Sequence, residues 1–274
     1  MSLSLAQQLS EAETFIRARY PHHVETGVVL GSGLGHFTKD MEEVLSIPYA
    51  DIPHFPISTV EGHSGALLLG KMGGRRVAVL SGRFHYYEGY TPGQVVFPIR
   101  VLRKLGVGTL LISNAAGGMN AGFRVGDLML IRDHISFFIV NPLIGPNEPD
   151  LGTRFPDMSQ PYDKELQQLV HTVAKEKGIS LKEGVYCGVT GPTFETRAEY
   201  KLLHVLGGDA VGMSTVQEVI AAVHAGIRVM AMSVITDMGI REEENTITHQ
   251  EVLEAAAQAE PKLTALFVGV LKAL

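Results

Sequence analysis

Short apolar runs that do not alternate with polar residues recur along this chain, and they constrain its fold more than any other feature. Runs of this kind are typical of strands buried on both faces of a sheet. Longer segments with helical spacing of apolar residues lie between them. This alternation predicts a three-layer α/β/α fold with a central mixed, largely parallel sheet. The strand candidates are 27–30, 76–80, 109–113, 128–131, 184–189, 210–213 and 229–235.

Capping residues mark where helices should begin and end. One helix is expected from Thr91, with Pro92 at its first position and Gln94 completing a capping box, to Gly106. Similar boxes predict helix starts at Thr196, Thr215 and Thr248, the last helix running to the C-terminus. Two more amphipathic helices are expected over residues 5–19 and 163–177.

Nothing in the sequence suggests a linker, a repeat or a low-complexity tract, so we expect a single domain over residues 1–274. The only long irregular segment is 141–161, which carries prolines at 142, 146, 149 and 156. Loops of this length in a compact domain are often functional or contact a neighbouring subunit.

Two glycine-rich segments resemble nucleotide-binding motifs but miss a defining residue. Segment 31–35 begins like a dinucleotide fingerprint, but the third required glycine is replaced by His36. Segment 65–72 fits G-x-x-x-x-G-K without the final Ser or Thr, and its leucine-rich interior is typical of a hairpin strand. Glycine backbone N–H groups at 31–35, with the Ser32 hydroxyl, suit an anion or form a tight turn.

Charge and residue usage exclude several classes of partner. The net charge is −6 without any run of basic residues, which argues against nucleic acid. Cys187 is the only cysteine, so no internal disulfide is possible. The N-terminus lacks a basic signal-peptide region, and no stretch approaches a membrane span. The 11 histidines form no zinc motif. We expect a cytoplasmic protein that binds no metal and no membrane.

Polar residues follow most of the strand candidates, and this predicts one shared pocket at the strand ends. Arg83 and Ser214 suit an anion, although an ion pair or a helix cap would explain them equally well. Glu195 and Asp237 could read the N–H groups of a base or supply a proton. Glu195 could instead be an ordinary carboxylate at a helix N-terminus.

Taken together, five motifs closely resemble the trimeric, low-molecular-mass class of purine nucleoside phosphorylases. They occur in that family's order and span most of the chain. The motifs are Gly31-Ser32-Gly33-Leu34-Gly35, Gly82-Arg83-Phe84-His85-Tyr86-Tyr87-Glu88-Gly89-Tyr90, Ser113-Asn114-Ala115-Ala116-Gly117-Gly118, Gly191-Pro192-Thr193-Phe194-Glu195 and Val211-Gly212-Met213-Ser214-Thr215.

The resemblance implies a role for each matching position. Phosphate would be held by Ser32, His63, Arg83, His85, the Ala115 backbone N–H and Ser214. The ribose would meet Tyr87, Met213, His249 and, from a neighbouring subunit, Leu151. The base would contact Ala115, Phe194, Glu195, Val211 and Asp237, with Asn114 supporting the pocket. Asp237, His85 and Glu195 would act in catalysis, and residues 33–38 and 241–248 resemble mobile covers.

The resemblance implies phosphorolysis of inosine and guanosine, or their deoxy forms, by a homotrimer without a cofactor, with inorganic phosphate as co-substrate. Two departures affect this expectation. Leu151 replaces a frequent aromatic residue, so ring stacking on the sugar is lost, and Asp237 replaces a frequent Asn. A methylthioadenosine or adenosine phosphorylase therefore stays an alternative. An oxidoreductase that binds a nucleotide and a non-catalytic nucleoside-binding protein are more remote ones.

Overall fold

The structure is a computed structural model that describes residues 3–32, 34–60, 64–240 and 247–274. One nine-stranded sheet runs through it in the order β2-β3-β4-β1-β5-β8-β7-β6-β9. In chain order, the strands are β1 (Thr26–Leu30), β2 (Glu42–Pro48), β3 (Ala66–Met72), β4 (Arg75–Ser81), β5 (Thr109–Gly118), β6 (Leu128–Ile135), β7 (Lys182–Gly188), β8 (Ala210–Gly212) and β9 (Arg228–Met238).

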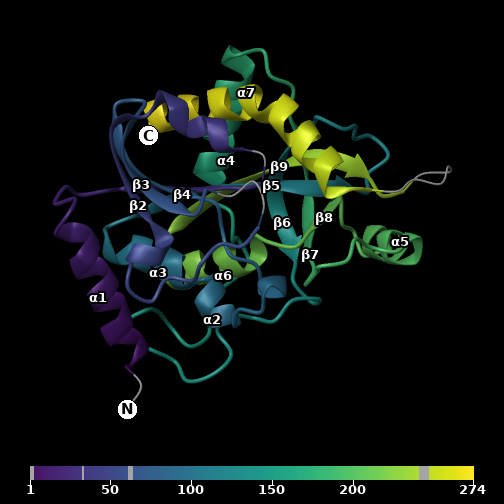
Figure 1. Cartoon of the computed structure of the whole chain (residues 1–274). Helices are drawn as coiled ribbons and strands as arrows, with labels where there is room; N and C mark the ends of the chain where they lie inside the picture. Colours follow the sequence, from purple (N-terminus) through teal and green to yellow (C-terminus); the bar gives the residue numbers. More distant parts are fainter. Residues whose placement is uncertain (1–2, 33, 61–63, 241–246) are drawn as a thin grey trace.

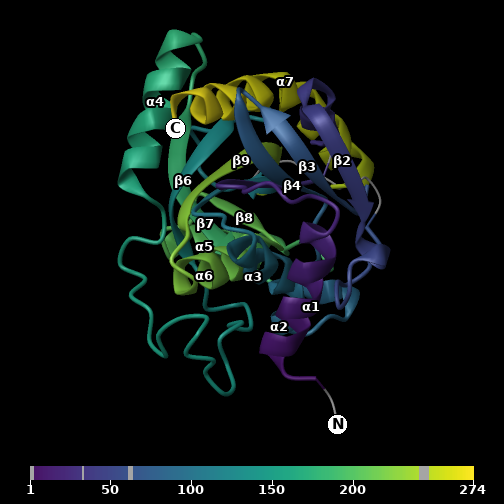
Figure 2. The ribbon, with the colours of Figure 1, turned by 90° about the vertical axis from the view of Figure 1, so that its left-hand side faces the viewer.

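Helices cover both faces of this sheet, as Figures 1 and 2 show. One apolar core lies beneath α4 and α7, and another lies beneath α1, α3 and α6. The expected three-layer arrangement around a mixed sheet is therefore confirmed. The α-helices are α1 (Leu5–Arg17), α2 (Pro92–Val95), α3 (Phe97–Lys104), α4 (Lys164–Glu176), α5 (Arg197–Val205), α6 (Val216–His224) and α7 (His249–Ala273). Short 3₁₀ helices are η1 (Gly35–Asp40), η2 (Tyr49–Asp51) and η3 (Tyr86–Glu88).

Part of the sheet closes on itself around β5. This strand pairs with β1 and β9 in parallel and, at Gly117 and Gly118, with β8 in antiparallel register. Because β9 also pairs with β6, strands β5, β8, β7, β6 and β9 form a ring. β5 extends well beyond the predicted 109–113, and the ring brings its last residues between β8 and β9.

The edge of the sheet shows one missed strand and one confirmed hairpin. β2 was not expected, because its acidic sequence is mostly exposed and lacks an apolar pattern. The interpretation of 65–72 as a hairpin strand is confirmed, since β3 pairs with β4 from Ala66 opposite Ser81 to Met72 opposite Arg75. Gly73 and Gly74 have positive φ angles in the turn between them.

Two expected helix starts need correction. The single helix predicted over 91–106 is split at Val96, because Pro98 has no N–H to donate to the carbonyl four residues earlier. The capping box predicted at Thr215 is wrong. Thr215 has φ 68° and ψ −55°, and its side chain makes no cap hydrogen bond. The boxes at Thr91, Thr196 and Thr248 are present.

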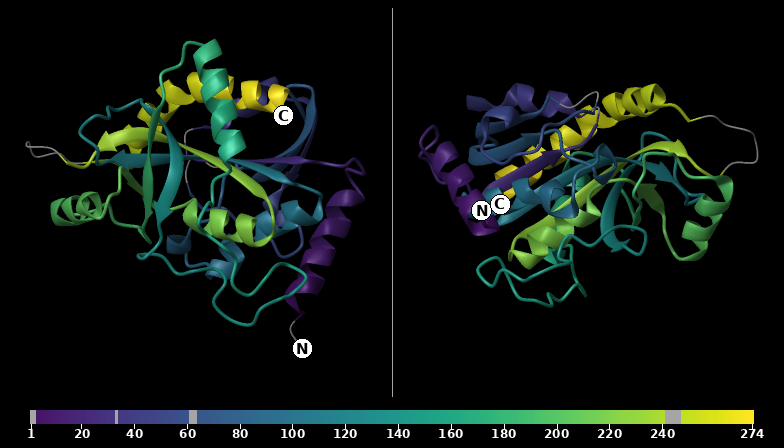
Figure 3. Two further views of the ribbon diagram at one scale, coloured as in Figure 1. Left: turned by 180° about the vertical axis from the view of Figure 1, so that it is seen from behind. Right: turned by 60° about the horizontal axis from the view of Figure 1, so that its bottom comes forward.

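Segment 141–161 contains no helix or strand, as its prolines predicted. It forms the long teal loop near the N-terminal helix in Figures 2 and 3. Its own contacts hold it together, since Arg154 donates to the Leu143 carbonyl at 3.0 Å and Asn147 to that of Gly152 at 3.2 Å. Leu151 packs against the core beneath α1, α3 and α6.

Candidate active site

A cavity of about 340 Å³ opens where β1, β4, β5, β8 and β9 end. The sequence predicted one pocket at these strand ends, and the structure brings most of the predicted residues together in its wall. Those that line it are Ser32, Arg83, His85, Tyr87, Asn114, Ala115, Phe194, Glu195, Val211, Met213, Ser214, Asp237 and His249. His63 and most of the expected cover at 241–248 lie outside the described residues.

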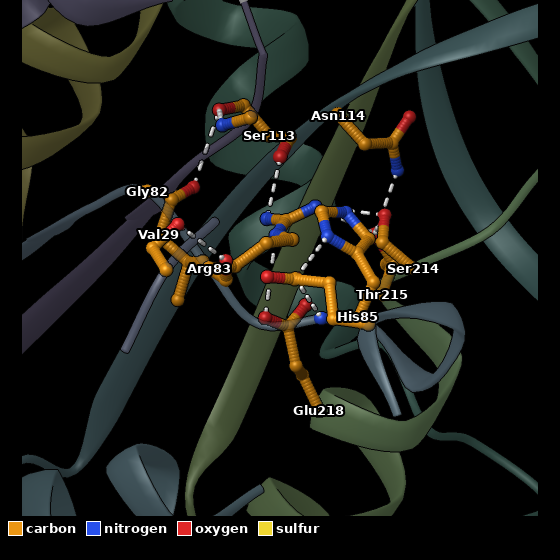
Figure 4. A network of polar contacts seen from close by, with 12 residues as sticks. Val29, Gly82, Arg83, His85, Ser113, Asn114, Ser214, Thr215 and Glu218 are labelled. Carbon is orange, nitrogen blue, oxygen red and sulfur yellow. Dashed lines mark hydrogen bonds and ion pairs between the residues drawn. The ribbon is translucent and has the colours of Figure 1, made fainter. Parts of the chain in front are cut away.

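Arg83 is held in place at one end of this cavity. It lies two residues after the end of β4, and its side chain is 2% exposed. Figure 4 shows its contacts. One terminal nitrogen donates to the Ser113 carbonyl on β5 at 2.7 Å, and the other to the Ser214 hydroxyl at 2.8 Å. Its Nε lies 3.3 Å from Oε1 of Glu218 on α6. Contacts from β5 and from the first residues of α6 therefore hold the guanidinium group in place.

Thr215 links Arg83 to the strand behind the cavity. Its Oγ1 accepts from Asn114 Nδ2 at 2.9 Å and from Arg83 at 3.3 Å. A positive φ costs a β-branched residue about 1–3 kcal/mol, and it persists only where surrounding contacts hold it. Here the positive φ turns the Thr215 hydroxyl toward Arg83 and Asn114, and it does not cap α6.

His85 is buried beside the same end of the cavity and is paired with Glu88. Its Nδ1 lies 3.1 Å from Oε1 of Glu88, which also accepts from the His85 backbone N–H at 2.7 Å. Burial lowers the pKa of His85, so the ring is neutral at pH 7. Burial alone would raise the pKa of Glu88, but hydrogen bonds from His85 and Thr59 bring it to about 2. The Glu88 carboxylate therefore keeps the proton of the His85 ring on Nδ1, and Nε2 can accept a hydrogen bond.

Two carboxylates lie at the other end of the cavity. Asp237, on β9, is 7% exposed, and its Oδ1 accepts from the Thr236 hydroxyl at 3.1 Å. Burial raises the pKa of Glu195, and the nearby charge of Asp237 raises it further. The Tyr200 hydroxyl, from α5, donates a hydrogen bond to Glu195 and opposes this rise.

Gly117 on β5 makes room for these side chains. A methyl group at Gly117 would lie 3.0 Å from Oδ2 of Asp237 and 3.3 Å from the Tyr200 hydroxyl oxygen. Any side chain there would therefore press on both groups. This close approach explains why the small residues at the end of β5 form part of the site.

The wall between the two ends is largely apolar. Tyr87 stacks on His85 with ring centroids 4.7 Å apart, and Met213 lies beside it across Gly191. Val211 is buried, whereas Phe194 is 40% exposed at the mouth. His249 is the first residue of α7, which Thr248 caps. The cavity thus joins a cationic, hydroxyl-rich end to a carboxylate end through an apolar middle.

Leu151 lies apart from the predicted site residues that line the cavity, and the structure adds three residues to the site that were not predicted. Leu151 is not among the described residues that line this cavity, and it borders a second cavity beside Arg100 and His224. Sequence reasoning missed Glu218, Glu88 and Tyr200. Glu218 had been interpreted as part of a capping box, Glu88 lay within a quoted motif without a role, and Tyr200 had no signal beyond its position in a helix.

The described residues contain no group of three or more His, Cys, Asp or Glu side chains placed to hold a metal ion. Within the same ranges, no helix has both the length and the apolar character needed to cross a membrane.

This chain is similar in sequence to known proteins over most of its length. The model of the phosphorylase superfamily matches residues 25–272. Purine nucleoside phosphorylase 1 of Geobacillus stearothermophilus is 49% identical over 266 residues, covering 97% of this chain and 96% of that protein. Purine nucleoside phosphorylase of Bos taurus is 50% identical over 256 residues, covering 91% and 88%.

Solved structures extend the likeness to the fold. A Schistosoma purine nucleoside phosphorylase in complex with hypoxanthine has a TM-score of 0.94 at 39% identity, covering 100% of this chain and 99% of that one. The Schistosoma mansoni enzyme in complex with adenosine has a TM-score of 0.93 at 40% identity, covering 98% and 97%. The chain therefore belongs to the phosphorylase superfamily and is an enzyme of its purine nucleoside phosphorylase group.

Proposed function

We propose that this enzyme transfers the ribosyl or deoxyribosyl group of inosine and guanosine to inorganic phosphate, and that it cleaves adenosine less efficiently. The observation that carries this proposal is the polarity of the cavity. Arg83 and its hydroxyl neighbours lie at one end, and Glu195 and Asp237 lie at the other. No cofactor is needed, because phosphate itself is the nucleophile.

The phosphate end would stabilise the positive charge that develops on the sugar. A phosphate oxygen bonds to C1′ as the C1′–N9 bond breaks, and the electron pair of that bond leaves with the purine. Arg83, Ser32, Ser214 and the Ala115 N–H would hold the phosphate below C1′, with His63 at its edge. Neutral His85 would accept a hydrogen bond from the remaining phosphate O–H through Nε2.

The carboxylate end would read the base and stabilise its negative charge. Ionised Glu195 can accept N1–H of hypoxanthine and both N1–H and the 2-amino group of guanine. Asp237 would face N7 and the 6-substituent. When protonated it donates to N7, and when ionised it accepts from a 6-amino group. Phe194 and Val211 would flank the purine ring, while Tyr87, Met213 and His249 would contact the ribose.

Leu151 would serve the ribose site of a neighbouring copy in a closed homotrimer. Its position outside the lining of its own cavity supports this, as does the long 141–161 segment that carries it. Sedimentation at micromolar concentration should give three times the chain mass, and a monomer would contradict the assembly. The buried, unpaired Cys187 supports our proposal of a cytoplasmic location.

The competing function is a methylthioadenosine or adenosine phosphorylase, which Asp237 favours and Glu195 disfavours. We would measure kcat/KM for inosine, guanosine, adenosine and methylthioadenosine in the wild type and in Asp237→Asn. Inosine and guanosine should be the better substrates. Asp237→Asn should raise the inosine-to-adenosine ratio about tenfold, because Asn satisfies N7–H and O6 without charge. An unchanged ratio would remove Asp237 from the base site.

A further inference from the structure

Three groups that can bind or release protons meet at the base end of the cavity. Glu195 precedes α5, Tyr200 belongs to α5, and Asp237 ends β9, and all three line the same cavity. The Tyr200 hydroxyl donates to Glu195, and both Tyr200 and Asp237 approach Gly117. Tyr200 and Asp237 are 3% and 7% exposed, so both side chains are largely shielded from water.

We propose that Glu195, Tyr200 and Asp237 act as one proton-sharing unit that makes the purine preference of this enzyme depend on pH. The pocket would read 6-oxopurines when both carboxylates are ionised, and 6-aminopurines when Glu195 carries a proton. The inference rests on the proposed function, since it assumes that the base binds at this end of the cavity.

When Glu195 and Asp237 are both ionised, the pocket can pair with only one edge of each base. The Glu195 carboxylate accepts N1–H of hypoxanthine, but it faces a lone pair at N1 of adenine. The Asp237 carboxylate accepts from the 6-amino group of adenine, but it faces the lone pairs of O6 in hypoxanthine. Each base therefore gains one contact and meets one repulsion when both carboxylates are ionised. In this form the 6-oxopurine is the better substrate under the proposed function.

Protonation of Glu195 reverses the preference between hypoxanthine and adenine. Its O–H can then donate to N1 of adenine, while ionised Asp237 accepts the 6-amino group, so both edges of adenine are paired. Hypoxanthine loses the charged acceptor for N1–H and keeps the repulsion at O6. Lower pH should therefore favour adenosine over inosine.

Burial raises the pKa of Glu195, and Tyr200 lowers the pH at which this change occurs. Its hydroxyl stabilises the ionised form of Glu195, and removing it should make Glu195 easier to protonate. Among the described residues, the other charged groups that face Glu195 are Asp237 from β9 and Glu199 from α5, and His249 at the start of α7 lines the same cavity. Arg83 and His85 lie at the opposite end and act on both substrates alike.

The test is the ratio of kcat/KM for adenosine to kcat/KM for inosine between pH 5.5 and 8.5. Titration of phosphate and of His85 affects both substrates and cancels in this ratio. The variants are Glu195→Gln, which cannot titrate, and Tyr200→Phe. Tyr162→Phe is the matched control, because Tyr162 is equally buried and its hydroxyl contacts His134 at 3.0 Å, away from this group.

We expect the wild-type ratio to rise about tenfold as pH falls. Glu195→Gln should give a flat ratio, and Tyr200→Phe should move the midpoint to higher pH, which Tyr162→Phe should not do. A flat wild-type ratio, or a rise that survives in Glu195→Gln, would overturn the inference. A Tyr200→Phe midpoint equal to that of the control would remove Tyr200 from the unit. Loss of phosphate-dependent cleavage of both nucleosides at every pH would instead overturn the proposed function, and this inference with it.

Discussion

Glu218 offers a sharp test of how Arg83 is held. The two side chains are 5% and 2% exposed, so solvent screens their attraction little. Removing one partner of a buried ion pair costs about 3–5 kcal/mol, because the other charge is left uncompensated. Arg83 keeps its bonds to Ser113 and Ser214, so we expect about 3 kcal/mol for Glu218→Ala. At roughly 2–4 °C per kcal/mol, the apparent Tm should fall by about 6–12 °C.

Inorganic phosphate should recover much of this loss. A phosphate bound at Arg83 supplies a new counter-charge, so phosphate should raise the Tm of Glu218→Ala more than that of the wild type. Scanning calorimetry with and without saturating phosphate measures both effects. The matched control is Gln217→Ala on the same helix, where Gln217 donates to the Val140 carbonyl at 2.7 Å. It should lose stability equally in both buffers.

An equal loss of stability in Glu218→Ala with and without phosphate would contradict this coupling. Glu218 would then support α6 without being coupled to the anion site. A variant as stable as the wild type in phosphate-free buffer would also contradict it, because a buried arginine that loses its counter-charge should destabilise the fold.

Two further predictions concern the two ends of the cavity. Arg83→Ala and Ser214→Ala should each raise KM for phosphate by about 10- to 150-fold, the equivalent of about 1.5–3 kcal/mol, and change KM for inosine much less. Unchanged phosphate saturation in both would refute the anion-site assignment. Glu195→Gln should raise the Tm of the ligand-free enzyme at pH 7, since burial raises the native pKa of Glu195 and ionisation destabilises the native state. This gain should vanish below about pH 4, where the carboxyl is protonated in both states, and a gain that persists there would contradict the assignment.

Much of the fold was predictable because its strands are buried on both faces. Such strands leave continuous apolar runs in the sequence, and all seven predicted runs overlap strands of the sheet. β2 was missed because an exposed edge strand needs no apolar pattern. The ring closure could not be predicted, because it depends on β5 pairing with three different strands along its length.

The residues of the cavity were predictable where they follow buried strands, since strand ends converge in space. The residues that contact these side chains from behind the cavity were not predictable. A sequence pattern assigned Thr215 and Glu218 to a local helix cap, whereas tertiary contacts with Arg83 and Asn114 determine their conformation. Tyr200 lies on a helix without a strand-end motif, and only the approach of α5 to β5 brings its hydroxyl beside Asp237.

The most direct test of the central claim follows the products of one reaction. The purified chain is incubated with inosine, with and without inorganic phosphate, and hypoxanthine and sugar products are followed by absorbance and ³¹P NMR. The account predicts one ribose 1-phosphate for each hypoxanthine, no turnover without phosphate, and strongly reduced turnover in Arg83→Ala at subsaturating phosphate. Release of free ribose, or equal rates with and without phosphate, would contradict it.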